Sequence, residues 1–456
     1  MFCAILLLVT SVSYGQQSPS MFEVTYKPKE LKKDILFVKQ QLEEKHPALY
    51  WYIDKSQLDG KFDSLAKSIK KPLTLRQFRY KLACVLASIG DGHMSLQFDQ
   101  EYLTSQDKRN VDGTKVLPLK QLEYEIVEGR LFVAKSYDTL IARGAEITAI
   151  DGKPVAEVLS TLTAAMPSDG YNKSFKYHVL KKAMLPDLYY MYYGYKDTVT
   201  LRYDQGETPA TFTLVSSLEP EKFRDPNGAS LLYWETGMPE TQEDAPASLN
   251  IRFFDNNFDQ MMIDFFASLK KKGRKSLVLD LRGNMGGQHS SMIKLFSYLI
   301  NKPTYFAQVF NRDGERDVTG DLRLGTAMPV FPSANHFDGT LYIYVDEGTF
   351  SAASLLAGSL QAINRGTIVG RETGGGRSGS VGGSYVQSIL PNSELLLKFG
   401  EKLIKIPGKA ELAGHGVIPD ASTSYTVQDF LSDEDLEHKW LVSQLWPEAY
   451  KRHWPD

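Results

Sequence analysis

Ser351 is the first residue of this chain whose position suggests chemistry. It stands in DEGTFSAASLLAGSLQ, residues 346–361, where an extended run gives way to a helical pattern. A structural helix cap is the simplest interpretation, because a serine hydroxyl often accepts a hydrogen bond from an unpaired amide at a helix N-terminus. The same position suits a nucleophile, because the positive end of the helix dipole stabilises a developing oxyanion and the Ala352 amide could donate to it.

A serine nucleophile needs a general base, and His93 is one candidate. The segment SIGDGHMSLQF places His93 after Asp91 and Gly92, in a polar turn between a helical pattern and an alternating strand pattern. Of the eight histidines, His46 is interpreted as a packing residue, and the others lie in loop or surface contexts. Because many histidines only make structural hydrogen bonds, position alone does not choose between a base and a structural role.

Two glycines could lend backbone amides to an oxyanion. Gly286 and Gly287 lie in DLRGNMGGQ, directly after a buried-type strand pattern. Ligands of parallel sheets bind at the carboxyl ends of the strands, so we expect this loop and the Ser351 loop at one edge. A turn that needs positive φ is the alternative use of such a pair. Residues 372–383, ETGGGRSGSVGG, are interpreted as a mobile loop over a cleft.

The elements that must position these residues form three regions. Residues 29–90 carry apolar residues at helical spacing, which predicts a small helical domain. From about 113 to 217 the pattern is β-rich, with turn signals at residues 128–129 and 151–152. Residues 218–245 are rich in Pro, Glu, Asp and Ser and resemble a connector. Strands and helices then alternate, which predicts an α/β domain with a largely parallel sheet.

Composition excludes several classes of function. The chain has 456 residues and a net charge of −3, and it is too long for one ordinary domain. Charges of both signs are mixed along it, so we expect no nucleic-acid partner. Cys3 and Cys84 alone form neither a disulfide framework nor a cysteine-based metal site. The sequence also lacks a Gly-x-Ser-x-Gly elbow, a His-Glu-x-x-His pair and a Walker loop. We expect no metal and no cofactor.

The first residues, MFCAILLLVTSVSYGQQ, have the pattern of a secretory signal peptide, an apolar run followed by small residues. The run is too short to span a bilayer as a mature helix, and no later segment is long enough. We therefore expect cleavage near Gly15, no integral membrane segment after cleavage, and export to the periplasm or the cell exterior.

Four segments in order resemble the catalytic domain of the C-terminal processing (tail-specific) serine peptidases and their tricorn-core relatives. They are LVLDLRGNMGG, YVDEGTFSAASLLAGSLQ, GTIVGRETGGG and GHGVIPD. EKHPALYWY and IGDGHMSL resemble the N-terminal helical domain of tricorn-type exported bacterial members. The resemblance runs in pieces from about residue 30 to 425, and it implies a crotonase-like α/β catalytic domain.

By motif, the nucleophile of this family falls on Ser351. The Ser-Lys branch places its base in the glycine-rich stretch that follows, where this chain has Arg377, and arginine cannot lose its proton in a protein. The resemblance therefore implies the tricorn branch, with His93 as the base. The competing bases are four lysines in LKFGEKLIKIPGK, at a spacing typical of solvated surface charges: Lys398, Lys402, Lys405 and Lys409.

The residue that orients His93 stays open. The tricorn pattern has a serine directly before the histidine, where this chain has Gly92. It also has a glutamate shortly before a segment like GHGVIPD, and Glu411 matches that position only with a small shift. Asp91 could substitute.

The middle region resembles a PDZ domain through RGAEITAIDGKPV. Such domains bind an extended peptide by strand addition and hold its terminal carboxylate with backbone amides. The sequence shows no clear Gly-Leu-Gly-Phe-like carboxylate loop, so the resemblance does not establish specificity for a C-terminus.

We therefore interpret the sequence as an α/β multidomain, exported serine endopeptidase that hydrolyses peptides or unfolded proteins. Ser351 would attack, His93 would transfer the proton, and Gly286 or Gly287 with Ala352 would supply oxyanion donors. The alternative is a non-catalytic peptide- or ligand-binding protein on the same scaffold, and the oligomeric state stays unknown. The predicted organisation is a signal peptide (1–15), an N-terminal helical domain (22–112), a PDZ-like domain (113–217), a connector (218–245), a catalytic α/β peptidase domain (246–430) and a C-terminal helical tail (431–456).

Overall fold

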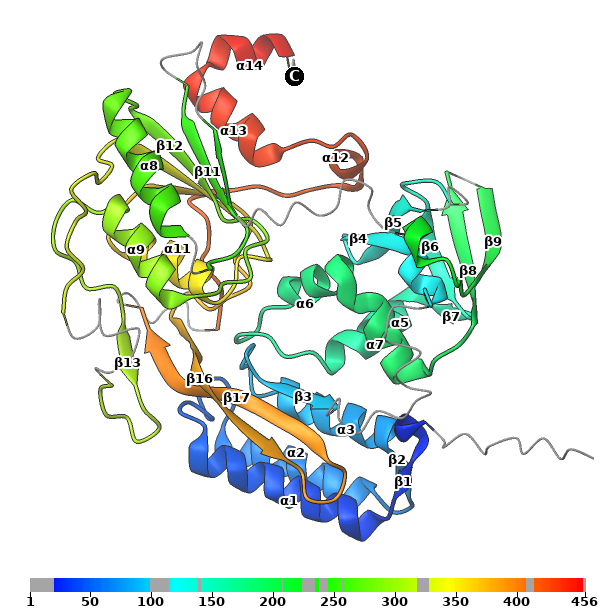
Figure 1. Cartoon of the computed structure of the whole chain (residues 1–456). Helices are drawn as coiled ribbons and strands as arrows, with labels where there is room; N and C mark the ends of the chain where they lie inside the picture. The colour runs from blue at the N-terminus through cyan, green and yellow to red at the C-terminus, as the bar shows by residue number, and fades with distance from the viewer. Residues whose placement is uncertain are drawn as a thin grey trace, which may run out of the picture.

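The fold comprises three bodies and a C-terminal helical segment. In the computed structural model (Figure 1), the N-terminal helices lie at the bottom, a β-rich body lies at the right, and an α/β body lies at the upper left, with the C-terminal helices beside it. The predicted signal peptide and Glu411 lie outside the described residues. The structure describes residues 20–98, 115–137, 141–206, 208–223, 234–237, 245–255, 258–317, 328–406 and 414–453.

Three helices form the N-terminal body, in the region whose periodicity is helical. Thr74 begins the third helix with a capping box, in which its hydroxyl accepts from the Gln77 amide and the Gln77 side chain accepts from the Thr74 amide. Leu31, Val38 and Phe78 are fully buried between the helices. The elements are η1 (Met21–Glu23), β1 (Thr25–Tyr26), α1 (Pro28–Lys45), α2 (Lys55–Ser68), β2 (Leu73–Thr74), α3 (Leu75–Ala87) and β3 (Ser95–Phe98).

The β-rich body is an antiparallel sheet in the order β4-β5-β6-β8-β9, with β7 paired to β6. Both predicted turns are present, and Glu128, Gly129, Asp151 and Gly152 all have positive φ, as tight hairpin turns require. The strands are β4 (Leu122–Val127), β5 (Arg130–Ser136), β6 (Glu146–Ile150), β7 (Lys153–Pro154), β8 (Thr198–Gln205) and β9 (Thr208–Val215). Its helical segments are η3 (Pro118–Gln121), α5 (Val155–Ala164), α6 (Ser174–Val179), the π-helical η4 (Leu180–Met184) and α7 (Leu185–Tyr193), and η5 (Pro220–Phe223) follows β9.

The α/β body contains a sheet in the order β10-β11-β12-β14-β15-β18, parallel except for β10. Asp280 and Tyr344 are register partners at the carboxyl ends of β12 and β14, so the loops that follow these strands begin side by side. The strand β10 falls in the segment that resembles a connector. The elements are β10 (Trp234–Gly237), β11 (Ala247–Ile251), α8 (Phe258–Lys271), β12 (Ser276–Asp280), α9 (His289–Leu299), β14 (Thr340–Val345), α11 (Ala352–Ala362), β15 (Thr367–Gly370) and β18 (Ala421–Ser422).

A second sheet joins the N-terminal helices to the α/β body. Strand β17 (Leu395–Lys405) pairs with β13 (Gln308–Phe310), β16 (Gly379–Ile389) and β3. Its inward residues Leu395, Leu397 and Phe399 belong to the same buried cluster as the N-terminal helices. The end of the glycine-rich stretch, predicted as a mobile loop, is therefore strand from Gly379 onward, because its backbone pairs with β17.

The C-terminal segment packs on the face of the α/β sheet opposite α8, α9 and α11. Leu441 is buried in a small cluster with Val278, Tyr344 and Val369 of the sheet. Its helices are α12 (Val427–Leu431), α13 (Leu436–Leu445) and α14 (Pro447–His453).

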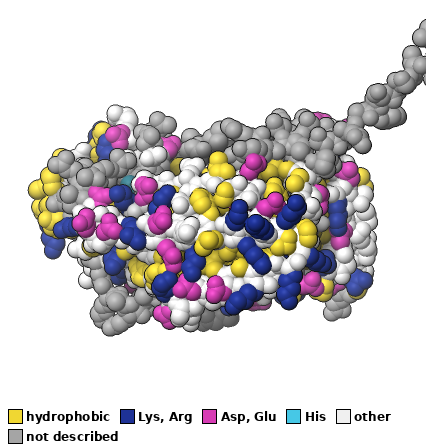
Figure 2. Space-filling view, turned by 90° about the horizontal axis from the view of Figure 1, so that it is seen from below, with side chains coloured by type: hydrophobic (Ala, Val, Ile, Leu, Met, Phe, Trp, Pro, Cys, Tyr) yellow, Lys and Arg dark blue, Asp and Glu magenta, His cyan; other side chains and the backbone are white. Residues whose placement is uncertain are grey.

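The surface carries mixed charge. Figure 2 shows the face at the bottom of Figure 1, where lysine and arginine side chains are interspersed with acidic and apolar ones. This pattern accords with the small net charge of −3. Among the described residues, no helix combines the length and apolar character that crossing a membrane requires.

Candidate active site

Ser351 occupies a sharp turn between β14 and α11. Its backbone has φ 53° and ψ −124°, a conformation that residues other than glycine rarely adopt and that often marks functional positions. Its side chain makes no capping hydrogen bond to α11, so the structure does not support the helix-cap interpretation.

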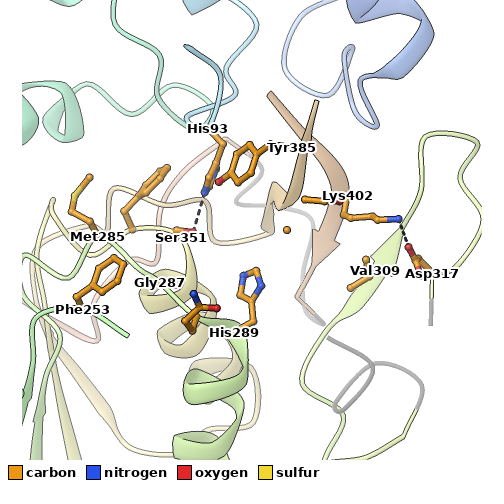
Figure 3. Close-up of a pocket in the computed structure, with 14 residues that line it drawn as sticks. His93, Phe253, Met285, Gly287, His289, Val309, Asp317, Ser351, Tyr385 and Lys402 are labelled. Atoms are coloured by element: carbon orange, nitrogen blue, oxygen red, sulfur yellow. Dashed lines mark hydrogen bonds and ion pairs between the residues drawn. The ribbon is translucent and has the colours of Figure 1, made fainter. Parts of the chain in front are cut away.

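His93 meets Ser351 from the N-terminal body. The loop between α3 and β3 carries the imidazole, and its Nε2 lies 3.0 Å from Ser351 Oγ, the contact dashed in Figure 3. The ring stacks on Phe350 with centroids 4.7 Å apart, and Phe350 in turn stacks on Phe175 of α6 at 4.4 Å. Aromatic packing therefore holds the plane of the imidazole, and residues from all three bodies contribute to it.

The two loops at the sheet edge are bonded to each other. The Phe350 amide donates to the Asn284 carbonyl at 2.9 Å, and the Thr349 hydroxyl donates to the Leu281 carbonyl at 2.8 Å. The Gly283 amide donates to Asp346 Oδ1 at 2.7 Å. The predicted juxtaposition of the glycine loop and the serine loop is thus confirmed, and their relative position is fixed by three hydrogen bonds.

The predicted oxyanion donors occupy different environments. The Gly286 amide donates to Asn284 Oδ1 at 2.8 Å, so this amide already has an acceptor. Gly287 lines the cavity beside Ser351, and its φ of 126° together with the adjacent Phe254 carbonyl leaves no room for a Cβ. Ala352 is the first residue of α11, where an amide has no acceptor within the helix.

Gly92 replaces the serine that the tricorn pattern places before the histidine. A Cβ at this position would lie 2.8 Å from Asp169 Oδ1 and 2.9 Å from the Phe350 ring. The glycine is therefore explained by close packing, and the hydroxyl expected there has no space.

Asp91 is committed to partners other than the His93 ring. Its Oδ1 accepts from the His93 backbone amide at 2.8 Å, and its Oδ2 accepts from His46 Nε2 at 3.1 Å. His46, interpreted from sequence as a packing residue, is buried and holds this carboxylate.

Asp169 was not identified from the sequence, and it lies beside His93. It is buried, and it accepts from the Gly92 amide at 2.8 Å and from the Gly376 amide at 3.0 Å. Burial raises its pKa to about 6, and Asp91 adds to the rise, whereas His93 and the two amides oppose it. No motif marks Asp169 in the sequence; only the folded chain brings it to the site.

The competing lysines have other contacts. Lys402 forms an ion pair with Asp317 across the cavity, Lys398 lies over the Tyr385 ring, and Lys405 lies over the Phe310 ring. Lys409 lies outside the described residues. Arg377, at the position of the Ser-Lys base, donates to the Gln361 side chain.

Ser351 and His93 face a cavity of about 850 Å³ (Figure 3). Apolar side chains and the partly exposed Lys402–Asp317 ion pair line it from different elements, and Phe253 and Met285 are exposed at its wall. The space suits an extended segment of several residues. The lining comprises His93, Phe253, Met285, Gly287, Gln288, His289, Val309, Asp317, Phe350, Ser351, Gly383, Ser384, Tyr385 and Lys402.

Within the described part of the chain, two groups of histidine and carboxylate side chains have spacing that could hold a metal ion. Asp91, His93 and Asp169 form one, and their carboxylate oxygens already accept hydrogen bonds. In the other, which consists of His178, Asp346 and Glu347, Asp346 accepts from two amides and Glu347 pairs with Arg371. Hydrogen bonds and an ion pair therefore already engage the carboxylates of both groups.

Comparison with known proteins finds a family match in the α/β body. The sequence model of peptidase family S41 matches residues 246–423, which include Gly286, Gly287 and Ser351 but not His93. The carboxy-terminal processing protease CtpA of Bacillus subtilis strain 168 is 28% identical over 221 residues, which are 45% of this chain and 44% of that protein. The alignment thus spans less than half the length of that curated relative.

Two solved structures share the fold over most of the chain. Mature CPAF complexed with lactacystin has a TM-score of 0.66 at 15% identity, covering 92% of this chain and 99% of that chain. Mature CPAF alone gives 0.64 at 16% identity, with coverages of 92% and 98%. Residues 246–423, which hold both site loops, thus match the model of peptidase family S41, and the CPAF structures show the same fold over most of the chain.

Proposed function

We propose that this chain is an exported serine endopeptidase in which Ser351 is the nucleophile and His93 is the general base. The observation that carries the proposal is the 3.0 Å separation of His93 Nε2 and Ser351 Oγ at the wall of the cavity. A nucleophile and a base within hydrogen-bond reach form the minimal arrangement for acyl transfer. The match of residues 246–423 to a peptidase family supports the same chemistry.

Acylation uses the two side chains and two amides. Ser351 Oγ donates its proton to His93 Nε2 as it attacks a peptide carbonyl carbon, and the carbonyl oxygen becomes an oxyanion. The Ala352 and Gly287 amides donate to this oxyanion, because the Gly286 amide is bonded to Asn284. Collapse of the tetrahedral intermediate breaks the C–N bond, and His93 returns the proton to the leaving amine.

Deacylation repeats the same steps with water. His93 accepts a proton from the water molecule that attacks the acyl ester on Ser351, and then returns a proton to Ser351 Oγ. The reaction requires only protein side chains and amides, so we propose no metal and no cofactor for it.

We propose peptides or unfolded proteins as substrates. The cavity contains apolar side chains and has room for an extended chain, which a folded domain does not present. We assign residues 113–217 as a PDZ-like domain and residues 246–430 as a crotonase-like domain, on the antiparallel sheet of the first and the parallel sheet of the second. The other boundaries remain those predicted from the sequence.

We propose export to the periplasm or the cell exterior, on the apolar run and small residues of the first 15 positions. The mature chain should begin near Gln16. N-terminal sequencing of the native protein tests this, and an intact Met1 would contradict it.

A fluorophosphonate probe separates the enzyme from a binding protein on the same scaffold. We expect the probe to label the wild-type protein, and Ser351→Ala to abolish labelling. Ser443→Ala is the matched control, because Ser443 lies in α13, where its hydroxyl donates to the Trp440 carbonyl and accepts from the Gln444 side chain. Equal labelling of Ser351→Ala and wild type would exclude Ser351 as the nucleophile, and no labelling of folded wild-type protein would favour a binding function.

A further inference from the structure

The second ring nitrogen of His93 lacks a partner. Nδ1 is buried, and it has no hydrogen-bond partner among the residues that the structure describes. A neutral imidazole that accepts the Ser351 proton at Nε2 must carry its own proton on Nδ1. A buried donor without an acceptor is costly, and the imidazolium formed during catalysis needs a nearby negative charge.

Two carboxylates lie near the His93 ring. One ring nitrogen of His93 and one oxygen each of Asp91 and Asp169 lie within 4.8 Å of one another. Catalytic hydrogen bonds are often long in a free enzyme and shorten when substrate binds, so this spacing is within reach of a direct contact.

The contacts of the two carboxylates favour Asp169. Asp91 divides its oxygens between the His93 backbone and the His46 ring, so a second imidazole competes for its charge. Among the described residues, the Asp169 side chain accepts only from backbone amides, and a carboxylate with two oxygens has about four lone-pair positions.

The position of Asp169 is rigid. Its carboxylate accepts a hydrogen bond from the Gly92 amide, next to His93. It also accepts one from the Gly376 amide, in the glycine-rich stretch that follows Ser351. The neighbouring Gly170 amide donates to the Gly90 carbonyl at 2.9 Å, so the segment is tied to the His93 loop twice. A carboxylate held in this way can orient a ring without moving itself.

We propose that Asp169 is the positioning carboxylate of His93, which accepts the Nδ1 proton and stabilises the imidazolium formed when Ser351 is deprotonated. Asp169 acts through His93 and does not contact substrate. The inference rests on the proposed function of the Ser351 and His93 pair, and it assigns the role for which the sequence left Asp91 and Glu411 open.

Asp169→Asn tests the proposal, because it removes the charge and keeps the side-chain shape. We expect kcat for peptide hydrolysis to fall by roughly 100- to 10,000-fold, with KM changed by less than about threefold. Asp91→Asn and Glu411→Gln, measured in the same way, should cost less in kcat. A dead Ser351→Ala enzyme with a fully active Asp169→Asn enzyme would overturn the role of Asp169 and leave the proposed function intact.

A matched control distinguishes positioning from simple structural support. Asp34 is also fully buried and accepts from the backbone amides of Asn392 and Ser393, far from the cavity. Asp34→Asn should lower the thermal midpoint and leave kcat within about twofold of wild type. If Asp169→Asn and Asp34→Asn lowered kcat equally after correction for folded protein, the positioning role would be excluded.

The pH dependence of kcat/KM distinguishes a positioning role of Asp169 from a purely structural one, because a structural role would not shift it. Titratable groups near the pair are His93 and Asp91 of the α3–β3 loop, Tyr52 after α1 and Tyr385 of β16. Removing a neighbouring carboxylate lowers the pKa of an imidazole, so the acid limb of kcat/KM should move to lower pH in Asp169→Asn. An acid limb at the same pH in Asp169→Asn and in the wild type would contradict the proposal.

If Asp169→Asn does not fold, the wild-type protein still provides a test. An imidazole Nδ1 proton bonded to a carboxylate gives a far-downfield proton resonance. We expect such a resonance in the wild-type protein, its loss in His93→Ala, and its retention in Asp91→Asn. Its absence from the wild type, or its loss only in Asp91→Asn, would overturn the assignment to Asp169.

Discussion

His93 Nε2 lies 3.0 Å from Ser351 Oγ although 258 residues separate the two in the chain. His93 belongs to the N-terminal body and Ser351 to the α/β body, so the contact exists only when these bodies are docked. The docking is maintained by β3, which follows His93 and pairs with β17 from Ser95 to Phe98. Any change that loosens this strand pairing should therefore reduce activity before it unfolds either body.

Ser351→Ala should abolish peptide hydrolysis and leave the thermal midpoint within a few degrees of wild type. The hydroxyl does not cap α11, so its loss removes no helix contact. Hydrolysis of an unstructured protein, together with a thermal melt, checks both parts. Retained hydrolysis would require another nucleophile.

His93→Ala should lower kcat by several orders of magnitude with little change in KM, because the base acts mainly in the transition state. The lysine variants provide the comparison. Lys398→Ala and Lys405→Ala should retain most activity, since their side chains lie over Tyr385 and Phe310 and not at Ser351.

Lys402 and Lys409 complete this comparison. Lys402→Ala breaks an ion pair with Asp317 in the cavity, so its effect should be on KM more than on kcat. Lys409→Ala should retain activity. A nearly wild-type His93→Ala enzyme with one inactive lysine variant would indicate a Ser-Lys mechanism instead.

Gly92→Ser restores the residue expected from the tricorn pattern, yet it should reduce activity at least about tenfold and lower the thermal midpoint. The new Cβ would lie 2.8 Å from Asp169 Oδ1 and 2.9 Å from the Phe350 ring. Both distances are shorter than the contacts that Cβ atoms make in folded proteins. Gly60→Ser is the control, because nothing lies within 4 Å of a Cβ at Gly60 in α2. Higher activity of Gly92→Ser would show that the site can accommodate the hydroxyl.

Acidification should change stability and activity in opposite directions through Asp169. Its pKa is raised from 3.8 to about 6, so the folded protein keeps a proton there that the unfolded chain releases at lower pH. The resulting stabilisation, roughly 3 kcal/mol, is present below the unfolded pKa and is lost as the pH rises through about 6. Catalysis instead requires the ionised carboxylate, so activity should fall below about pH 6.

Urea unfolding of the wild type and of Asp169→Asn across this pH range measures how much the Asp169 carboxyl contributes to the free energy of unfolding. The free energy of unfolding of the wild type should decrease relative to that of the variant as the pH rises. A difference between the two proteins that does not vary with pH would contradict the raised pKa.

Local patterns in the sequence predicted the two loops and made Ser351 a candidate, whereas His93 was chosen as the base through the resemblance to the tricorn branch. Ser351 follows a buried strand pattern, and His93 follows a long helical one. Asp169 could not be predicted, because its role comes from contacts with Gly92 and Gly376, which are 77 and 207 residues away. From the sequence, Gly286 and Gly287 were equal candidates for the oxyanion donor. Only the position of the Asn284 side chain, which accepts from the Gly286 amide, distinguishes them.

Glu437→Gln tests whether the C-terminal helix α13 supports the active-site loops. The Glu437 side chain is fully buried, and it pairs with Arg282 at 2.9 Å and with Arg371 at 3.1 Å. Arg282 lies in the glycine loop, and Arg371 also binds Glu347 in the loop before Ser351. Removing the buried charge takes one carboxylate partner from each guanidinium group, although Arg282 keeps Asp280 and Asp435 and Arg371 keeps Glu347.

We expect Glu437→Gln to lower the free energy of unfolding by about 3 kcal/mol and to lower kcat at a temperature where the variant is still folded. Glu434→Gln on the same segment is the control, because its pair with Lys439 spans 3.9 Å and is partly exposed, so its effect should stay within about 0.5 kcal/mol. Denaturant unfolding and peptide hydrolysis measure the two effects. Equal losses in the two variants would mean that Glu437 does not link the C-terminal helix to the loops that carry Gly287 and Ser351.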